Sequence, residues 1–271
     1  MTPPRVLIVA GSDSGGGAGI QADIKTVTML GGFAMTAIAA LTAQNTLGVQ
    51  GVMPVPADFV LAQIESVLAD LGADVVKLGM IGSAATATAV AARLEALGSL
   101  PIVFDPVMAA SSGSVLADPE TIAAFERLMR VATIVTPNAP ELAVLTGRAV
   151  ETLDDLAAGA EALAARTGTA VLAKGGHLPG ETLTDLLVRP GAPARRWHSP
   201  RRDSRNTHGT GCTLASAIAC GLGAGMAIED AVDRARAYVQ ATLAAAPGFG
   251  AGHGPMGHSL DADPFGRITG D

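Results

Sequence analysis

The glycine-bearing segment Asn206–Thr213 contains the residue types that bind phosphate. It reads Asn-Thr-His-Gly-Thr-Gly-Cys-Thr and lies directly before an apolar run of helical period. Glycines let a ligand approach the backbone closely, and the first amide groups of a helix point outward at the positive end of its dipole. We therefore expect Gly209, Thr210 and Gly211 to form an anion hole that holds a phosphoryl group during transfer.

Cys212 follows the anion hole in the same segment. A thiol in the first turn of a helix has its pKa lowered below the usual value of about 8.5 by the helix dipole. A partly ionised thiolate could accept or orient the proton of an attacking hydroxyl group. A buried, unreactive cysteine after a glycine-rich helix start fits the same residues, and the motif alone does not separate the two interpretations.

A second glycine-rich segment, Gly11–Gly19, follows the first apolar run. It lacks the spacing of a dinucleotide-binding fingerprint, and no Gly-Lys-Ser/Thr follows as in a phosphate-binding P-loop. We expect this loop to pack against a small ligand, with Asp23 one turn into the next helix. A purely structural turn fits the loop equally well.

Asn138 and Glu141 follow a third apolar run and are three residues apart. Residues at this spacing share one side of a helix start, and their oxygen atoms suit Mg²⁺. They also match a capping box, with Asn138 as N-cap and Glu141 at the third helical position, and the two interpretations are compatible. Lys174, at the end of a later apolar run, could reach nucleotide phosphates, although most lysines are simply solvated.

Short apolar runs alternate with longer segments of helical period, which predicts an α/β fold with a mostly parallel sheet and helices on both faces. The expected strands are Val6–Ala10, Val75–Leu78, Ile102–Phe104, Ile134–Val135 and Ala170–Ala173. The expected helices are Ala18–Leu30, Asp58–Leu71, Ala84–Leu97, Pro119–Met129, Leu153–Thr167, Gly211–Leu222 and Ile228–Ala245. Asp58 and Asp118 are the expected N-caps of two of these helices, the second with Pro119 at the first helical position.

The rhythm changes in the C-terminal third. Leu183–Val188 and Ala194–His198 flank Pro190-Gly191 and predict an antiparallel hairpin at the sheet edge. The tail from about residue 247 is rich in Gly and Pro and is expected to be irregular. No segment resembles a linker, so we predict a single domain over residues 1–271, with its ligands beyond the carboxyl ends of the strands.

Composition excludes several classes of partner. Of 271 residues, 49% are hydrophobic and 16% charged, and the net charge of −7 argues against nucleic acid or an anionic membrane. We see no export signal and no apolar run long enough to span a bilayer. The two cysteines are about 12 Å apart if both lie on one helix, too far for a disulfide, so we expect a cytoplasmic protein.

These segments together resemble the hydroxymethylpyrimidine/phosphomethylpyrimidine kinases of thiamin biosynthesis, which belong to the ribokinase-like superfamily. The resemblance runs from Ala10–Ser14 to Gly252–Pro255, and the order and spacing of its motifs make it specific. The intervening motifs are Ala22–Lys25, Leu41–Thr46, Lys77–Met80, Asp105–Met108, Thr136–Asn138 with Glu141, Lys174–His177 and His208–Leu214.

The resemblance implies a three-layer α/β/α fold, ATP with Mg²⁺ as cofactors, and a homodimer. It implies phosphorylation of 4-amino-5-hydroxymethyl-2-methylpyrimidine and then of its monophosphate to the diphosphate. Gln44 would pair with the amino group and ring nitrogen of the pyrimidine, since an amide offers a donor and an acceptor together. Asp23, Met80 and Val107 would line the same pocket, and Gly11 and Ala18 would close it.

The phosphate machinery is implied in the same way. Cys212 would stand where most of the superfamily has an aspartate base, as a weaker base or as a group that positions the hydroxyl. Lys174, Asn138 and Thr207 would contact the nucleotide. Glu141 and Asn138 would organise Mg²⁺ and its water, with Asp105 nearby acting through water.

Three alternatives remain at this point. A pyridoxal kinase of the same cysteine-bearing branch, or a dual-specificity enzyme, shares the phosphate machinery, but Gln44 favours the aminopyrimidine because pyridoxal-preferring relatives tend to have an apolar residue there. A sugar or nucleoside kinase typically has a lid insertion and an Asp at position 212. A catalytically silent binding protein conflicts with the presence of Lys174, Asn138, Glu141 and Cys212.

Overall fold

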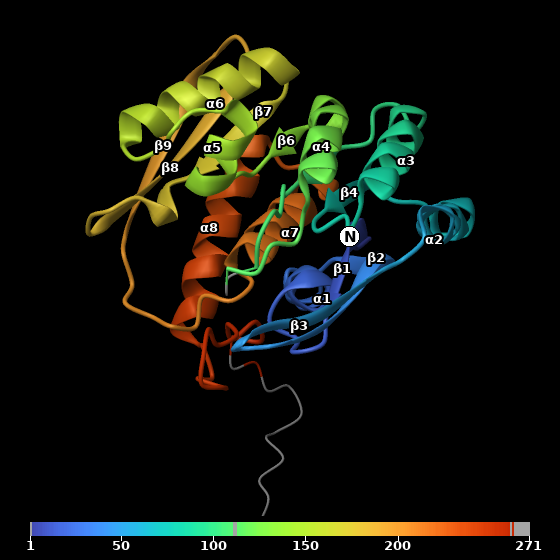
Figure 1. The fold of residues 1–271 in the computed structure, drawn as a ribbon, viewed down its shortest axis with the longest axis horizontal. Coiled ribbons are helices and arrows are strands. Elements are labelled where there is room, and N and C mark those ends of the chain that lie inside the picture. The colour runs from blue at the N-terminus through green and yellow to red at the C-terminus, as the bar shows by residue number, and fades with distance from the viewer. Residues whose placement is uncertain (1, 111–112, 261, 263–271) are drawn as a thin grey trace, which may run out of the picture.

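The computed structural model describes residues 2–110, 113–260 and 262 (Figure 1). A nine-stranded sheet runs through this part of the chain, in the order β3-β2-β1-β4-β5-β6-β7-β8-β9. The strands are β1 (Arg5–Asp13), β2 (Phe33–Asn45), β3 (Gly48–Pro54), β4 (Val75–Leu78), β5 (Ile102–Phe104), β6 (Ile134–Val135), β7 (Ala170–Lys174), β8 (Thr182–Arg189) and β9 (Ala192–Pro200).

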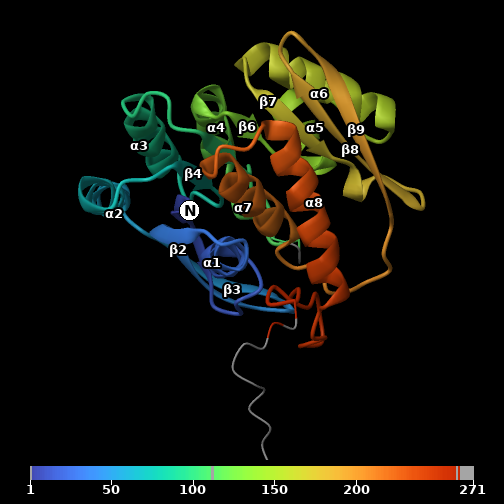
Figure 2. The same ribbon diagram turned by 180° about the vertical axis from the view of Figure 1, so that it is seen from behind.

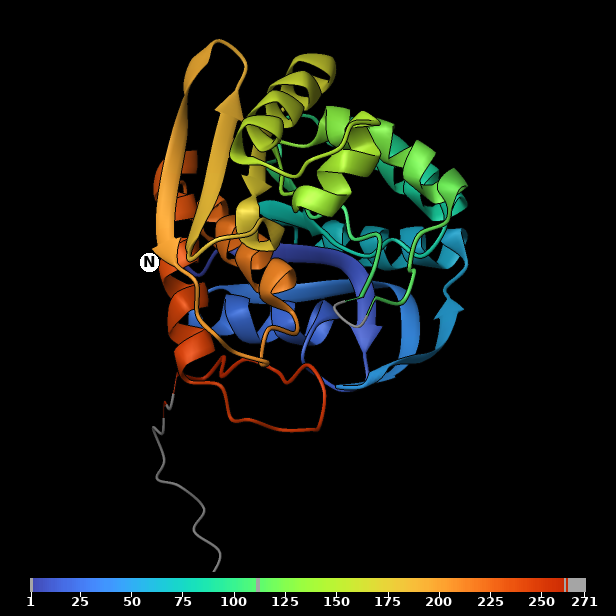
Figure 3. The same cartoon turned by 60° about the vertical axis from the view of Figure 1, so that its left-hand side comes forward.

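Helices cover both faces of the sheet and make three layers. One apolar core lies beneath α2 (Ala57–Asp70), α3 (Ala84–Glu95), α4 (Pro119–Val131), α5 (Ala139–Thr146) and α6 (Leu153–Thr167). A second core lies beneath α1 (Gly19–Met29), α7 (Thr210–Gly223) and α8 (Ile228–Ala244) on the opposite face (Figure 2). The side view shows the two groups of helices separated by the strands (Figure 3). This is the predicted α/β/α architecture.

Parallel pairing aligns the residues that follow the central strands. From β2 through β7 neighbouring strands are parallel, and β4, β5 and β6 are buried along their whole length, which explains why they are apolar apart from Lys77 in β4. Asp105 donates its backbone N–H to Leu78, and Lys174 donates its own to Pro137. The carboxyl ends of β4 to β7 therefore meet at one edge, as the sequence predicted.

Local capping explains where the helices begin. Asp118 accepts a hydrogen bond from the backbone N–H of Thr121, with Pro119 in the first turn, as expected. The expectation for α2 was wrong, because its N-cap is Pro56 and Asp58 already lies inside the first turn. An acidic side chain there still interacts favourably with the helix dipole, so Asp58 keeps a role at this helix start.

The sequence did not predict the β2–β3 ribbon or helix α5. In β3 most residues are exposed, so the strand lacks the apolar alternation that identifies a half-buried strand. Helix α5 has only eight residues and follows the capping motif directly. Both elements depend on tertiary contacts, β3 on its antiparallel pairing with β2.

The C-terminal part behaves as expected where it is described. The β8–β9 hairpin turns at Pro190-Gly191, and residues 247–260 contain no helix or strand. His253 donates its backbone N–H to Thr46, which brings the tail beside the β2–β3 turn (Figure 3). The rest of the predicted irregular tail, 261 and 263–271, lies outside the described residues.

Two further expectations concern the whole chain. Cys212 and Cys220 are both free thiols, in agreement with the predicted absence of a disulfide. Among the described residues, no helix is both long enough and apolar enough to cross a membrane.

The core on the α2–α6 face generates a stability prediction. Phe104 and Phe125 are fully buried and meet edge to face, with ring centroids 5.2 Å apart. We expect Phe125→Ala to lower the free energy of unfolding by about 3–5 kcal/mol, because it removes packing and leaves a cavity. Urea denaturation measures this. Phe59→Ala, at a largely exposed residue of α2, is the control and should change stability by less than about 0.5 kcal/mol. Equal losses in both variants would contradict the packing argument.

Candidate active site

A cavity of about 770 Å³ opens at the carboxyl edge of the sheet. It brings together nearly all the residues that the sequence singled out. Those in its wall are Gly11, Ala18, Gln44, Met80, Asp105, Val107, Asn138, Glu141, Lys174, Thr207, Gly209, Thr210, Gly211 and Cys212. The exception is Asp23, which lies beneath the cavity floor. One continuous cavity therefore connects the loop after β1, the ends of β2, β4 and β5, and the start of α7.

The start of α7 has the backbone that an anion hole needs. Gly209 is the N-cap and adopts φ +84, and a Cβ there would lie 2.0 Å from the backbone oxygen of Gly17. Both conditions select glycine. Thr210 donates its backbone N–H to Thr207 at 3.3 Å. The following amides, of Gly211 and Cys212, have no intrahelical acceptor at this end of the helix and point along the dipole.

Gly211 lies against a lysine–aspartate ion pair. A Cβ on Gly211 would meet Asp105 Oδ2 at 3.1 Å and Lys174 Nζ at 3.3 Å. Lys174 Nζ donates to Asp105 Oδ1 at 2.9 Å, and Thr136 Oγ1 donates to the same oxygen at 3.0 Å. Burial lowers the pKa of Lys174, but the charges of Asp105 and Glu141 outweigh it and raise that pKa. A lysine that stays charged thus lies next to Gly211 at the start of α7.

A second buried ion pair supports the cavity floor and corrects the role expected for Asp23. Lys77 Nζ donates to both carboxylate oxygens of Asp23, at 2.9 and 2.8 Å, and Ser216 Oγ donates to one of them at 2.7 Å. Neither charged side chain has any exposed surface, but Lys77 reaches the cavity wall. Asp23 is therefore the partner of Lys77 and is not among the residues that line this cavity.

The expected activation of Cys212 is also corrected. Burial raises the pKa of its thiol to about 12, and the charges of Asp23 and Asp105 add to this effect. The charge of Lys77 lowers the pKa but does not compensate. The helix dipole was expected to give a low pKa, yet removal from water disfavours the thiolate more strongly. With a pKa of about 12, the Cys212 thiol keeps its proton at neutral pH.

Asn138 and Glu141 form the capping box that the sequence allowed. Asn138 Oδ1 accepts from the Glu141 backbone N–H at 2.9 Å, and Glu141 Oε2 accepts from the Asn138 backbone N–H at 2.8 Å. Burial raises the pKa of Glu141 to about 7; the charge of Lys174 opposes this and that of Asp105 adds to it. No cluster of three or more His, Cys, Asp or Glu side chains suited to a metal occurs among the described residues.

The donor atoms here nevertheless suit Mg²⁺ with water and phosphate oxygens as further ligands. Asp105, Asn138 and Glu141 offer only oxygen, which this hard cation prefers. A buried carboxylate whose pKa is raised gains most from an added positive charge. The site residues are therefore compatible with a cation held largely through water.

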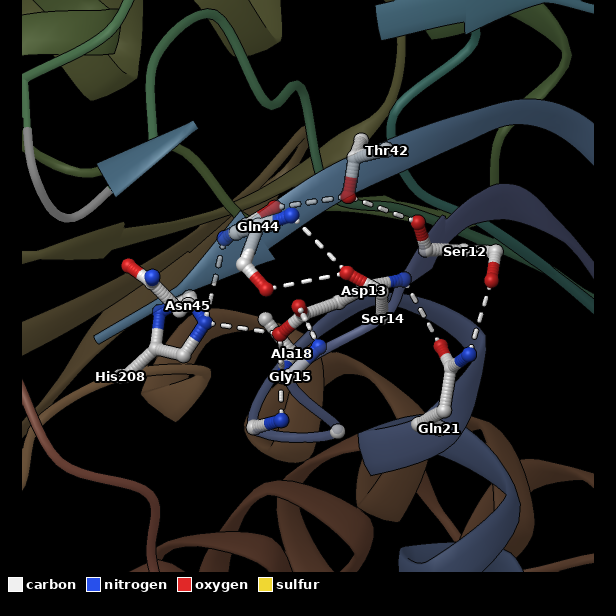
Figure 4. Close-up of polar contacts among 12 residues, drawn as sticks. Ser12, Asp13, Ser14, Gly15, Ala18, Gln21, Thr42, Gln44, Asn45 and His208 are labelled. Carbon is white, nitrogen blue, oxygen red and sulfur yellow. Dashed lines mark hydrogen bonds and ion pairs between the residues drawn. The ribbon is translucent and has the colours of Figure 1, made fainter. Parts of the chain in front are cut away.

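At the other end of the cavity, Gln44 belongs to a hydrogen-bonded network (Figure 4). Gln44 Nε2 lies 3.2 Å from His208 Nε2, and Thr42 Oγ1 lies 3.1 Å from Gln44 Oε1. His208 Nε2 is also 2.8 Å from Asp13 Oδ2. Burial would raise the pKa of Asp13, but hydrogen bonds from His208 and from backbone amides hold it below its ordinary value.

Sequence reasoning gave no role to Asp13, Lys77 or His208. All three occur in segments that had been singled out for their glycines or strand ends. A lysine inside an otherwise apolar strand was the available signal for Lys77, because such a residue requires a buried partner. For Asp13 and His208 no local signal existed, because their contact joins the two glycine-rich loops.

The fold and the cavity define an α/β protein whose helix N-terminus, a type of site suited to phosphate, faces a pocket for a small ligand. The family model for phosphomethylpyrimidine kinase matches residues 13–257. The chain belongs to this family, which confirms the resemblance read from the sequence. It is 46% identical to a hydroxymethylpyrimidine/phosphomethylpyrimidine kinase of Rhizobium meliloti, over 93% of this chain and 96% of the relative.

Longer relatives contain a similar segment. The chain is 47% identical to a thiamine biosynthesis bifunctional protein ThiED of Geobacter sulfurreducens, of which it spans 53%, and 44% identical to a multifunctional ThiED of Corynebacterium efficiens, of which it spans 35%. The chain thus spans about half or less of these two proteins.

Solved structures share the fold. An ADP complex of Bacillus subtilis pyridoxal kinase is 30% identical with a TM-score of 0.87, covering 96% of this chain and 98% of that one. A phosphomethylpyrimidine kinase from Clostridium difficile is 36% identical with a TM-score of 0.77, covering 88% and 98%. These similarities confirm the predicted ribokinase-like fold.

The raised pKa of Glu141 generates a prediction for stability against pH. The protonated Glu141 carboxyl group contributes fully to the stability of the fold below the ordinary carboxyl pKa of 4.5. This contribution is lost as the pH rises through about 7. We expect the wild type to lose stability relative to Glu141→Gln between about pH 5 and pH 8. Glutamine keeps the capping box, because its carbonyl oxygen can accept from Asn138. Chemical denaturation across this range measures the difference.

The matched control is Glu161→Gln on α6, which removes an exposed carboxylate. Its difference from the wild type in free energy of unfolding should not change with pH in the way expected for the Glu141 variant. A pH-independent difference for Glu141→Gln would show that Glu141 does not titrate in this range.

Proposed function

We propose that this protein transfers the terminal phosphoryl group of ATP to 4-amino-5-hydroxymethyl-2-methylpyrimidine. The hydroxymethyl oxygen forms the new bond to phosphorus, the bond to the β-phosphate oxygen breaks, ADP leaves and the hydroxyl proton is released. A second transfer, to the monophosphate, gives the diphosphate. This places the protein in thiamin biosynthesis, in agreement with the family and with its hydroxymethylpyrimidine kinase relatives.

One observation carries the proposal: the helix start at Gly209–Cys212 and the amide of Gln44 line the same cavity. The helix start suits a phosphoryl group, and the amide suits a heterocycle that has a donor beside an acceptor. Gly11, Ala18, Met80 and Val107 supply the rest of the pyrimidine pocket, and a Cβ on Gly11 would meet the sulfur of Met80 at 3.2 Å.

The nucleotide is proposed to lie beside Lys174, Asn138 and Thr207. Charged Lys174, held by Asp105, would neutralise phosphate charge next to the amides of Gly211 and Cys212. Glu141 and Asn138 would hold Mg²⁺ through water, with Asp105 nearby, and the cation would supply charge neutralisation on the phosphates. A similar solved structure, the pyridoxal kinase of Staphylococcus aureus, is a complex with AMP-PCP and pyridoxal, which supports ATP as the donor.

Cys212 is proposed to act as a positioning group. A thiol with a pKa of about 12 holds its proton at neutral pH, so it can donate or accept a hydrogen bond without being a strong base. Phosphoryl transfer depends mainly on positioning and charge stabilisation, and a weak base is sufficient for it.

Substrate preference tests the proposal. A pyridoxal kinase activity is the second candidate, favoured by the similarity to Bacillus subtilis and Staphylococcus aureus pyridoxal kinases. We expect kcat/KM for the hydroxymethylpyrimidine to exceed that for pyridoxal by at least about tenfold, since Gln44 matches the aminopyrimidine edge. ADP release in a coupled assay measures both. A preference for pyridoxal would select the second candidate, and no turnover of either would contradict kinase activity.

Substitution of Cys212 separates its roles. We expect Cys212→Ala to lower kcat by at least about a hundredfold, with pyrimidine binding still measurable by calorimetry. Cys212→Ser should remain within about tenfold of the wild type if the group only positions the hydroxyl through a hydrogen bond. Cys220→Ala, on the same helix, is the control. Near-normal turnover by Cys212→Ala would show that phosphoryl transfer does not require Cys212.

We also propose a single domain over residues 1–271 that pairs as a homodimer in the cytoplasm. One continuous sheet through the described residues supports a single domain. The two free cysteines support a location in the cytoplasm. The apolar side chains of Leu47 and Met53 are 69% and 59% exposed along the β2–β3 ribbon, which supports an interface there.

A further inference from the structure

The side-chain amide of Gln44 lies between two polar neighbours at the cavity wall (Figure 4). Its nitrogen is 3.2 Å from His208 Nε2, and its oxygen is 3.1 Å from Thr42 Oγ1. Whether these contacts are hydrogen bonds depends on where the hydrogens are, and the surrounding groups determine this.

His208 carries a hydrogen on Nε2. Asp13 Oδ2 lies 2.8 Å from this nitrogen and also accepts from the backbone N–H groups of Gly17 and Ala18, at 3.1 and 2.8 Å. These contacts identify an ionised carboxylate, which can only accept. The ring nitrogen facing it must therefore donate. A nitrogen that carries a hydrogen has no lone pair for a hydrogen bond from the Gln44 amino group.

Thr42 has only one hydroxyl hydrogen to give. Its Oγ1 lies 3.0 Å from the backbone oxygen of Ser12, which can only accept. When the hydroxyl hydrogen points toward the Ser12 oxygen, the Thr42 hydroxyl can only accept a hydrogen bond from Gln44 and cannot donate one to it. The amide oxygen of Gln44 then faces an acceptor, and its nitrogen faces a donor.

We propose that the Gln44 amide is held turned by 180°, with its oxygen accepting from His208 and its nitrogen donating to Thr42, and that these two neighbours thereby determine which heterocycle edge the pocket accepts. The turned amide fills the same space, because its oxygen and amino group are similar in size. Each group in the network then has a compatible partner, with the His208 hydrogen shared between Asp13 and Gln44.

The fixed amide has a definite binding preference. An amide has two donor hydrogens and two acceptor lone pairs, and Thr42 and His208 use one of each. One donor on the Thr42 side and one acceptor on the His208 side remain for a ligand. They match a ring that places an acceptor nitrogen toward Thr42 and an exocyclic amino group toward His208. A ring with the reverse order, a carbonyl oxygen beside a ring N–H, does not fit.

This inference rests on the proposed aminopyrimidine kinase activity and deepens it. If the amide turned freely, it would pair equally well with either order, and the 4-oxo analogue of the substrate would be accepted. Since the amide is fixed, binding of that analogue places its ring N–H against the amino group of Gln44 and its carbonyl oxygen against the amide oxygen. One pair then consists of two donors and the other of two acceptors. Sites that leave buried polar groups unpaired discriminate by about 10⁴-fold or more.

The test compares the hydroxymethylpyrimidine with its 4-oxo analogue. We expect the wild-type protein to prefer the amino compound by at least about a thousandfold in kcat/KM. Thr42→Val keeps the side-chain shape but removes the oxygen that holds the amide, and should reduce this ratio at least about tenfold. Thr36→Val, the same substitution on the same strand outside the cavity, should keep the wild-type ratio. A residue that only supports the fold would lower activity toward both compounds without changing their ratio.

The outcomes distinguish the two proposals. Turnover of the amino compound with an equal response to the oxo compound, or an unchanged ratio in Thr42→Val, would overturn the fixed amide and leave the kinase activity intact. If neither compound is turned over, the proposed function fails, and calorimetric binding of both compounds tests the amide alone, with equal affinities or no binding refuting it. A crystal structure with the aminopyrimidine bound should show its amino group toward His208. The reverse orientation would refute the inference.

Discussion

A charge buried in a protein interior costs several kcal/mol unless an opposite charge and hydrogen bonds accompany it. Lys77 meets this condition through Asp23 on α1, which is itself bound by Ser216 on α7. The pair therefore connects the end of β4 to two helices on one face of the sheet, and α7 is the helix whose first turn we propose as the anion hole. Removal of either partner would leave an uncompensated charge directly beneath that turn. The position of the anion hole depends on this buried pair.

Close backbone approach is the second constraint on the same region. Gly209 needs its left-handed conformation and its contact with Gly17, which joins the loop after β1 to the start of α7. Gly211 leaves room for Lys174 and Asp105 from the opposite side. A side chain at either position would push the charged groups away from the helix start. The two glycine-rich loops, separate in the sequence, are thus parts of one structure.

Much of this arrangement was predictable because parallel strands deliver their following residues to one edge. Asp105, Asn138 and Lys174 were placed correctly for that reason, and the capping box followed from spacing alone. The β2–β3 ribbon was missed because β3 is mostly exposed and depends on its pairing with β2. The contact between Asp13 and His208 was missed because it joins distant segments. Asp23 was assigned to the ligand because the charge balance of Lys77 is visible only in three dimensions.

The pKa of Cys212 shows which of two opposing effects is larger. A helix dipole stabilises a charge in the first turn by about 0.3–1 kcal/mol. Burial disfavours the charged form by up to about 3–5 pKa units for a fully buried group, each worth about 1.4 kcal/mol, and by less for the partly buried Cys212. Burial therefore dominates, in agreement with a thiol pKa of about 12 despite the nearby charge of Lys77. In the proposed site, the same charge and the amides of the helix start would act on the transferring phosphoryl group, whose negative charge comes from the ligand itself. The proposed site thus directs its electrostatic stabilisation at phosphate, while a thiol with a pKa of about 12 stays neutral beside it.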